Sequence, residues 1–203
     1  MNSQADNRLK VGDICASDPI LANILKSLFG KNLPFQCLPR QIDCKDADSE
    51  KLLEDGFKRL FHCEEAEREK KVVLIWVLEK PYTYQNGKKS TVVRIDQTEN
   101  TIKKRWASSK LLAEDHKERC DEEAKCDFNN LEKLAKNDCN WSLFQKILCD
   151  FGPLRIWYSN VEELNNATVS EKFEKPQEWE KEICNKYKKY YDCTPLKDKN
   201  RCG

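Results

Sequence analysis

Histidine and cysteine are the residues of this 203-residue chain whose side chains could act in catalysis, form disulfides or bind a metal ion. A nucleophilic triad needs a base within reach of its nucleophile, and His62 and His116 are the two histidines in the sequence. Each lies in a charged, helical context with no partner at a suitable spacing. The six glycines are scattered and form no phosphate-binding loop. The sequence therefore predicts that the chain is not an enzyme, with no catalytic residue and no cofactor.

The eleven cysteines leave two interpretations of the redox state open. Many of them lie within apolar patterns, where a thiol acts as a small hydrophobic group. This placement favours reduced thiols and a cytoplasmic or nuclear protein. Two glycosylation sequons, beginning at Asn140 and Asn166, are more typical of a secreted protein. An odd cysteine count leaves one thiol over if all the others pair. A disulfide-bonded, secreted protein is therefore the alternative.

Three cysteines near the end of the sequence are nine residues apart, namely Cys184, Cys193 and Cys202. They are candidates for a disulfide staple or a metal cluster. Structural zinc sites usually contain two close pairs of ligands. The closest cysteine pairs in this chain are six and seven residues apart, which is wider than that pattern. We therefore expect no metal ion.

Charge and hydropathy narrow the range of partners. The chain has 36 Lys and Arg against 35 Asp and Glu, which argues against a general phosphate-binding surface. A local basic cluster, formed by Lys88, Lys89 and residues 103–105, leaves single-stranded nucleic acid open, although such charges are more typical of a solvated loop. The longest apolar run, Val72–Leu78, is far shorter than the roughly 20 residues of a membrane span. The first six residues lack the regions of a signal peptide, and we expect no membrane association.

The periodicity of apolar residues predicts an α+β fold with antiparallel β hairpins. Capping residues and helical spacing predict helices over 20–28, after Ser49, and from Pro176 to before Pro195. The region 106–136 predicts two helices with a break near 127–130. Strands are predicted at 72–78, 90–96, 143–149 and 154–158, and an extended segment at 41–44. A turn is predicted at Asn86-Gly87 and a short helical turn over 159–164.

Residues 143–164 resemble the end of a Tudor domain. In that family an apolar strand leads into Asp-Tyr-Gly-Asn, and a further strand then runs to a short helical turn closing on Leu. Here the matching motif is Asp150-Phe151-Gly152-Pro153. Val11-Gly12-Asp13 looks like the start of many Tudor barrels. Residues 33–112, which include Leu38-Pro39-Arg40-Gln41-Ile42-Asp43-Cys44, are similar in order to the nuclease-like half of extended Tudor domains.

The resemblance implies small Tudor-like and nuclease-like barrels with flanking helices. It places a nuclease-like part at 1–136 and Tudor-like strands plus a C-terminal helix at 137–203, either as two domains or as one integrated unit. The order departs from the family, because here the Tudor-like strands follow the nuclease-like half. Extended Tudor domains are scaffolds that bind methylated arginine–glycine tails of Piwi proteins in germline small-RNA (piRNA) silencing. The resemblance therefore implies a protein or peptide partner.

An aromatic cage around a cation is the basis of that recognition. The resemblance places Phe151 at the position of the cage tyrosine, and the nearby aromatic candidates are Trp141, Trp157 and Tyr158. Pro153 stands where the family has the Asn that bonds the guanidinium, so an unmodified peptide is also a candidate ligand. The first hypothesis is thus a non-catalytic peptide-binding module. The alternative is a secreted, disulfide-bonded ligand carrier or host-interaction factor.

Overall fold

The computed structural model of the protein describes residues 8–10, 12, 14, 17–107, 131–136 and 140–196. Its strands form one antiparallel sheet in the order β1-β2-β5-β3-β4. From edge to edge these are β1 (Arg8–Lys10), β2 (Asn32–Cys37), β5 (Leu154–Asn160), β3 (Val72–Thr83) and β4 (Lys89–Thr98). β5 therefore lies between β2 and β3, although it comes last in the sequence.

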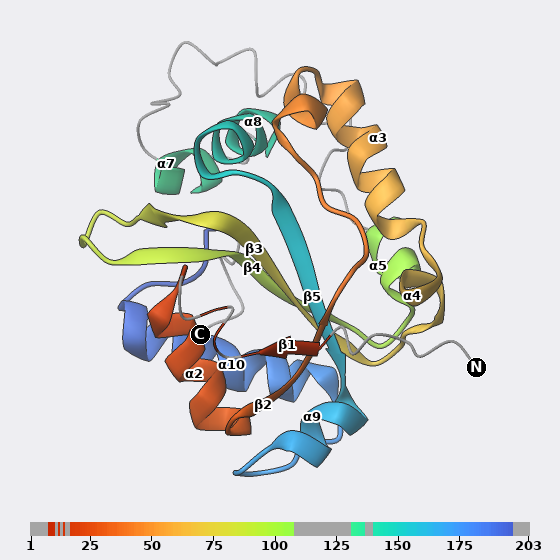
Figure 1. Cartoon of the computed structure of the whole chain (residues 1–203), viewed down its shortest axis with the longest axis vertical. Helices are drawn as coiled ribbons and strands as arrows, with labels where there is room; N and C mark the ends of the chain where they lie inside the picture. The colour runs from red at the N-terminus through yellow and green to blue at the C-terminus, as the bar shows by residue number, and fades with distance from the viewer. Residues whose placement is uncertain are drawn as a thin grey trace.

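Helices cover both faces of the sheet (Figure 1). On one face α2 (Pro19–Phe29), α9 (Val161–Ala167) and α10 (Pro176–Tyr191) contact the strands. On the other face lie the 3-10 helix η1 (Cys44–Ala47), α3 (Glu50–Phe61) and α8 (Asn140–Phe151). The short helices on that side are α4 (Glu64–Arg68), α5 (Ile102–Ala107) and α7 (Leu131–Lys136).

The sheet is open over the described residues, with β1 and β4 as its edges. The predicted α+β class and antiparallel pairing are confirmed, but the predicted small barrel is wrong. The physical reason lies in the covering of the sheet. Val72–Leu78 of β3 is buried along its whole length, and helices on both faces provide that burial without closure into a barrel.

Aromatic side chains fill the core on both sides of the sheet. On the α3 side, the Phe57 ring lies 4.8 Å from that of Trp106 and 5.1 Å from that of Phe144. On the α10 side, the rings of Phe29 and Trp179 lie 5.4 Å apart. Such pairs stabilise a core through large buried areas. The two clusters hold the helical layers against opposite faces of the sheet.

The three helices predicted from capping signals are confirmed. α2 begins at Pro19, and the Asp18 side chain accepts a hydrogen bond from the Leu21 backbone N–H at 2.9 Å. Ser49 caps α3 by accepting a bond from the Leu52 backbone N–H. α10 begins at Pro176 as predicted.

Among the described helices, none combines the length and the apolar character that a membrane span requires.

The predicted β hairpin is also confirmed. Val72–Leu78 forms the first part of β3, and 90–96 lies within β4. Gly87 adopts a φ of +81° in the connecting turn, as the Asn-Gly signal predicts. The predicted strand at 154–158 is the main part of β5, and α9 is the predicted short helix after it.

One strand prediction is wrong. The segment 143–149 lies within the helix α8. Its buried residues Leu143, Phe144, Ile147 and Leu148 follow helical spacing, and a short apolar run does not distinguish a helix from a strand. The segment predicted as extended at 41–44 forms a bridge between Ile42 and Leu154 and is extended at Asp43, and its last residue, Cys44, begins η1. Most of the predicted helix pair over 106–136, with its break near 127–130, lies outside the described residues.

A disulfide between Cys44 and Cys149 joins η1 to α8, with 4.8 Å between the two Cα atoms. At this pair the structure therefore departs from the expectation of reduced thiols. Of the C-terminal cluster, Cys184 is buried in α10, Cys193 is partly buried, and Cys202 lies outside the described residues. No group of three His, Cys, Asp or Glu side chains suited to a metal ion occurs within the described part of the chain.

Candidate binding pocket

The structure separates the four aromatic residues that the sequence proposed for a cage. Phe151 ends α8, whereas Trp157 and Tyr158 lie on β5. Neighbouring strand residues face opposite sides of a sheet, so Trp157 and Tyr158 do not share a surface. Trp141 lies in the first turn of α8, about 15 Å along the helix from Phe151, and its side chain is outside the described residues. Phe151 lines a pocket.

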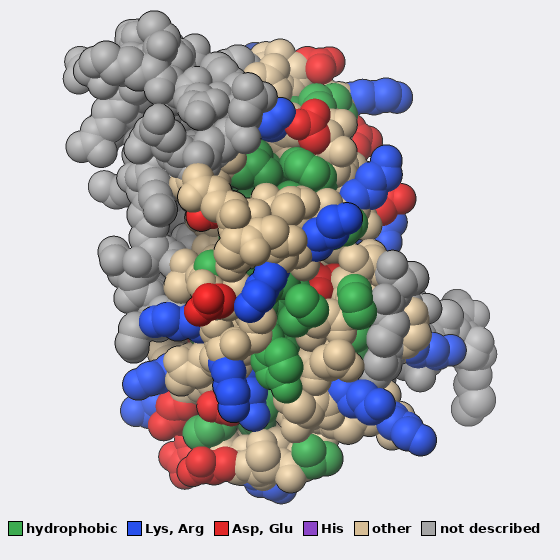
Figure 2. All heavy atoms as spheres, turned by 90° about the vertical axis from the view of Figure 1, so that its left-hand side faces the viewer, with side chains coloured by type: hydrophobic (Ala, Val, Ile, Leu, Met, Phe, Trp, Pro, Cys, Tyr) green, Lys and Arg blue, Asp and Glu red, His purple; other side chains and the backbone are tan. Residues whose placement is uncertain are grey.

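That pocket has a volume of about 450 Å³ and lies between the end of β3, α7 and α8. Known small-ligand sites occupy roughly 300–1,000 Å³, so its size suits one side chain or a small ligand. Figure 2 shows the side of the molecule toward which the β3–β4 hairpin of Figure 1 points, and acidic and basic side chains are interspersed there among hydrophobic ones. The residues around the pocket are Tyr82, Thr83, Tyr84, Gln85, Leu131, Glu132, Lys146, Asp150, Phe151 and Leu196.

Three aromatic rings line the pocket. The rings of Tyr82 and Tyr84 lie 5.1 Å apart, and Phe151 lies edge-on to Tyr82 at 6.1 Å. Tyr82 and Tyr84 are almost fully buried, whereas Phe151 is partly exposed. The two tyrosines therefore form the base of the pocket, and Phe151 forms an accessible wall.

Three charged side chains surround these rings. The Lys146 ammonium lies 2.6 Å from the Asp150 carboxylate, one helical turn away on α8. The Glu132 carboxylate of α7 accepts a hydrogen bond from the Gln85 backbone N–H at 2.8 Å. Among the described residues that line the pocket, two carboxylates thus outnumber one ammonium group. A ligand with a positive charge and a flat apolar face would match both the charge and the rings.

Behind the pocket, a chain of buried hydroxyl groups holds the tyrosine rings in place. The hydroxyls of Tyr82 and Tyr84 lie 2.8 Å apart, and those of Tyr84 and Tyr187 lie 2.7 Å apart. Tyr187 in turn donates to the Ser90 hydroxyl at 2.8 Å. Burial raises the pKa of all three tyrosines, so their hydroxyls stay neutral at physiological pH. The pocket base is therefore preorganised.

The partly buried thiols near and beyond this pocket are also neutral. Burial raises the pKa of Cys193, close to Tyr84, to about 11. Burial likewise raises the pKa of Cys37 and of Cys63 above the ordinary thiol range. Since the thiolate is the nucleophilic form, these three side chains are poorly suited to covalent catalysis.

Gly152 forms the turn between α8 and β5 and so orients Phe151. Its φ is +84°, and an added Cβ would lie 3.2 Å from the Cβ of Glu79. We expect Gly152→Ala to lower the free energy of unfolding by about 1–2 kcal/mol, measured by urea denaturation. Gly87→Ala is the matched control, because Gly87 has a similar φ of +81° and nothing within 4 Å of an added Cβ. A loss at Gly152 no larger than that at Gly87 would contradict the contribution of the Glu79 contact.

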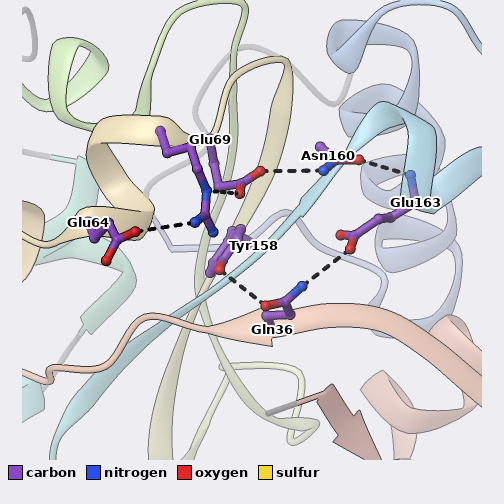
Figure 3. A network of polar contacts seen from close by, with 7 residues as sticks. Gln36, Glu64, Glu69, Tyr158, Asn160 and Glu163 are labelled. Carbon is purple, nitrogen blue, oxygen red and sulfur yellow. Dashed lines mark hydrogen bonds and ion pairs between the residues drawn. The ribbon is translucent and has the colours of Figure 1, made fainter. Parts of the chain in front are cut away.

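Tyr158 belongs to a different group of contacts, shown in Figure 3. Its hydroxyl donates to the Gln36 side chain at 3.3 Å, and Gln36 donates to the Glu163 carboxylate at 3.2 Å. Asn160 accepts from the Glu163 backbone N–H and donates to Glu69 at 3.4 Å. Burial is the main cause that raises the pKa of Tyr158. These contacts tie β2, β5, α9 and the end of α4 together, which is a structural role.

A second, larger hollow of about 730 Å³ lies among β1, the end of α2, β2 and α9. Its rim carries Lys10, Lys31, Glu163 and Asn166. Figure 1 places α9 at the opposite end of the molecule from α7 and α8. The two hollows are therefore separate surfaces.

Sequence reasoning identified Phe151 but missed the other walls of its pocket. The alternation Tyr82-Thr83-Tyr84 at the end of β3, where both tyrosines are buried and the threonine is exposed, was a signal that could have revealed them. Glu132 gave no such signal, because only tertiary contact brings α7 to the hairpin.

The protein is of the α+β class, with an open antiparallel sheet between two helical layers. Searches of protein-family models, curated proteins and solved structures found no match to this chain.

Proposed function

We propose that this chain is a peptide-binding protein of an oxidising compartment. The pocket around Phe151 takes a cationic side chain of the partner. The observation that carries the proposal is the meeting of three aromatic rings and two carboxylates around one pocket of suitable size. This proposal keeps the binding role and the Phe151 site expected from the sequence. It replaces the four-residue cage by Tyr82, Tyr84 and Phe151.

Cation–π attraction and charge support a cationic ligand. Each contact of a cation with a ring contributes about 0.5–2 kcal/mol, with the larger values in desolvated sites. Arginine fits this pocket better than lysine because a planar guanidinium stacks on a ring and binds a carboxylate through two N–H groups. Phe151 offers the ring, and Asp150 and Glu132 offer the carboxylates.

Preorganisation supports affinity for such a ligand. The hydroxyls of Tyr82, Tyr84 and Tyr187 are paired with one another. Binding therefore orders few additional side chains, and each rotamer-rich side chain that is ordered costs about 0.5–1.5 kcal/mol. A rigid aromatic base with one accessible wall is a suitable surface for a single side chain.

The disulfide supports the oxidising compartment. Stable disulfides are rare in cytosolic proteins, where reducing systems keep thiols free. Cys44 and Cys149 bond two elements on the same face of the sheet. We therefore propose a secreted protein and not a cytoplasmic or nuclear one.

The partner peptide that we propose carries arginine. An arginine-rich tail of the kind bound by extended Tudor domains is one such ligand. Methylation of an arginine side chain leaves its positive charge in place. Pro153 contributes no side-chain donor or acceptor beside Phe151. Because methylation keeps the charge but blocks bidentate hydrogen bonding to a carboxylate, we expect unmodified arginine–glycine peptides to bind more tightly than methylated ones.

The test is the affinity of the purified chain for fluorescent arginine–glycine peptides. We expect Phe151→Ala to weaken binding by about tenfold, which corresponds to 1.4 kcal/mol, and a citrulline peptide to bind equally weakly. Tyr190→Ala is the matched control, because Tyr190 is a 44% exposed aromatic residue of α10 outside the pocket. Equal affinity of wild type and Phe151→Ala, or of the arginine and citrulline peptides, would overturn the proposal.

A further inference from the structure

Asn166 lies in the last turn of α9 and is exposed to solvent. Within the described part of the chain its side chain has no hydrogen-bond partner. It begins the sequon Asn166-Ala167-Thr168, whose middle residue is not proline. A free, exposed amide at the end of a helix leaves room for a bulky group without disturbing the core.

The neighbouring Asn165 shows the contrast. Its amide donates to the Phe173 carbonyl at 2.7 Å, and its side-chain oxygen accepts from the Phe173 backbone N–H and from the Trp179 indole at 3.2 Å. Asn165 is therefore used to hold the connection between α9 and α10. Asn166 has no comparable structural task, although it is the next residue.

Thr168, the third residue of the sequon, terminates α9. Its hydroxyl donates to the Leu28 carbonyl at 3.2 Å and accepts from the Ser170 backbone N–H at 3.1 Å. These contacts attach the chain after α9 to the end of α2. They turn the threonine inward while Asn166 remains outside, so the folded state accommodates a group on Asn166.

We propose that the Asn166 side chain carries an N-linked oligosaccharide. The inference rests on the oxidising, secretory compartment of the proposed function, where a lipid-linked oligosaccharide diphosphate is the donor. The Asn166 Nδ2 atom forms a bond to C1 of the first sugar, and the bond from C1 to the diphosphate oxygen breaks. The lipid diphosphate leaves with the electron pair, and one Nδ2 proton passes to a base of the transferase. No electrons are exchanged.

The position of this glycan has a consequence for binding. Asn166 lies on the rim of the 730 Å³ hollow, together with Lys10, Lys31 and Glu163. A glycan there shields that hollow. The pocket around Phe151 lies at the other end of the molecule, beside α7 and α8, and stays open (Figure 1).

The other sequon, Asn140-Trp141-Ser142, has a different setting. It forms the first turn of α8, and Ser142 is 1% exposed within the core. The helix α8 packs on η1 and β3. We assign the glycan to Asn166 because its exposed side chain is the sequon asparagine whose setting the structure describes.

The experiment expresses the full chain behind a signal peptide in animal cells and maps the secreted protein. Enzymatic release of glycans in ¹⁸O-labelled water converts each glycosylated Asn to labelled Asp. We expect the label at Asn166 in the tryptic peptide that spans 156–172. Asn166→Gln and Thr168→Ala are expected to lose it, and Thr168→Ser and Asn140→Gln to keep it.

Secreted protein with an unlabelled Asn166 would overturn the inference, and so would label at Asn140 alone. Arginine-peptide affinity is measured on the same sample before and after glycan release. Because the glycan is distant from Phe151, we expect the two affinities to agree within twofold. Loss of peptide binding with label at Asn166 would refute the proposed function alone, whereas binding without label would refute the glycan alone.

Discussion

Replacement of both Cys44 and Cys149 by alanine is expected to lower the free energy of unfolding by about 4–5 kcal/mol. The two cysteines are 105 residues apart in the sequence, so the disulfide closes a long loop in the unfolded chain. The entropic cost of closing a loop increases with the length of the loop. The disulfide closes this loop in the unfolded chain as well, so folding of the crosslinked protein loses less conformational entropy. The crosslink also fixes η1 against α8, the helix that ends at Phe151.

Urea denaturation of the double variant and the wild type, both without reductant, measures this loss. Cys63→Ala is the matched control, because it removes a partly buried thiol without removing a crosslink. We expect the control to lose less than about 1.5 kcal/mol, in the range of a small core truncation. A double variant as stable as the control would show that the disulfide contributes little to the folded state.

The pairing of these cysteines was not predictable from the sequence. Eleven cysteines allow many connectivities, and spacing along the chain does not select among them. Cys44 and Cys149 come together because η1 and α8 pack on the same face of the sheet. That approach is a tertiary property, whereas the apolar context that suggested reduced thiols is a local one.

The elements with local signals were predicted well. α2 and α3 begin directly after capping side chains, and the β3–β4 hairpin turns at Asn86-Gly87. In each case the residue that terminates or turns the element acts on backbone groups within four positions of itself. Such contacts exist before the chain has folded around them, so the sequence alone indicates them.

α8 shows where local reasoning failed. Its apolar residues occur in the pairs Leu143-Phe144 and Ile147-Leu148, which suit one face of a helix as well as a buried strand. The following Asp150-Phe151-Gly152 strengthened the strand interpretation through its resemblance to the Tudor motif. In the structure the same residues end a helix, and Gly152 with its φ of +84° starts the connection to β5.

The candidate site was predicted in part for the same reason. Phe151 was identified, and its position beside a glycine turn brings it to the surface. Its partners come from β3 and α7, which lie 69 and 19 residues away at Tyr82 and Glu132. The proposed neighbours Trp157 and Tyr158 are close in sequence, but strand geometry carries them away along β5. Nearness in sequence was therefore a poor guide to the walls of the pocket.

Asp18→Ala is expected to lower the free energy of unfolding by about 3–5 kcal/mol, far more than the loss of an ordinary helix cap. Asp18 is 1% exposed, and its carboxylate accepts from the Leu21 backbone N–H at 2.9 Å and the Thr91 backbone N–H at 2.8 Å. The Thr91, Ser90 and Tyr191 hydroxyls also donate to it. One side chain thus joins α2, β4 and α10.

The large loss expected for Asp18→Ala follows from the buried donors that the substitution leaves without an acceptor. Each buried donor without an acceptor costs about 1–3 kcal/mol, and Thr91 alone has two donors directed at this carboxylate. Ser49→Ala is the matched control, since Ser49 caps α3 at an exposed site by a single bond from the Leu52 N–H. We expect that control to lose only about 1 kcal/mol in the same urea titration.

Tyr191→Phe distinguishes the contribution of the hydrogen-bond network around Asp18 from that of Asp18 as the cap of α2. The tyrosine hydroxyl donates to Asp18 and is almost fully buried in α10, so its removal takes away one donor and leaves the cap of α2 intact. In a double-mutant cycle, Asp18→Ala and Tyr191→Phe are expected to be non-additive by about 1–2 kcal/mol, because the second substitution removes a donor that the first leaves unsatisfied. Additive losses, or an Asp18→Ala loss no greater than that of Ser49→Ala, would show that Asp18 acts only as a cap. A coupled loss would instead identify Asp18 as one of the contacts that join α10 to α2 and β4.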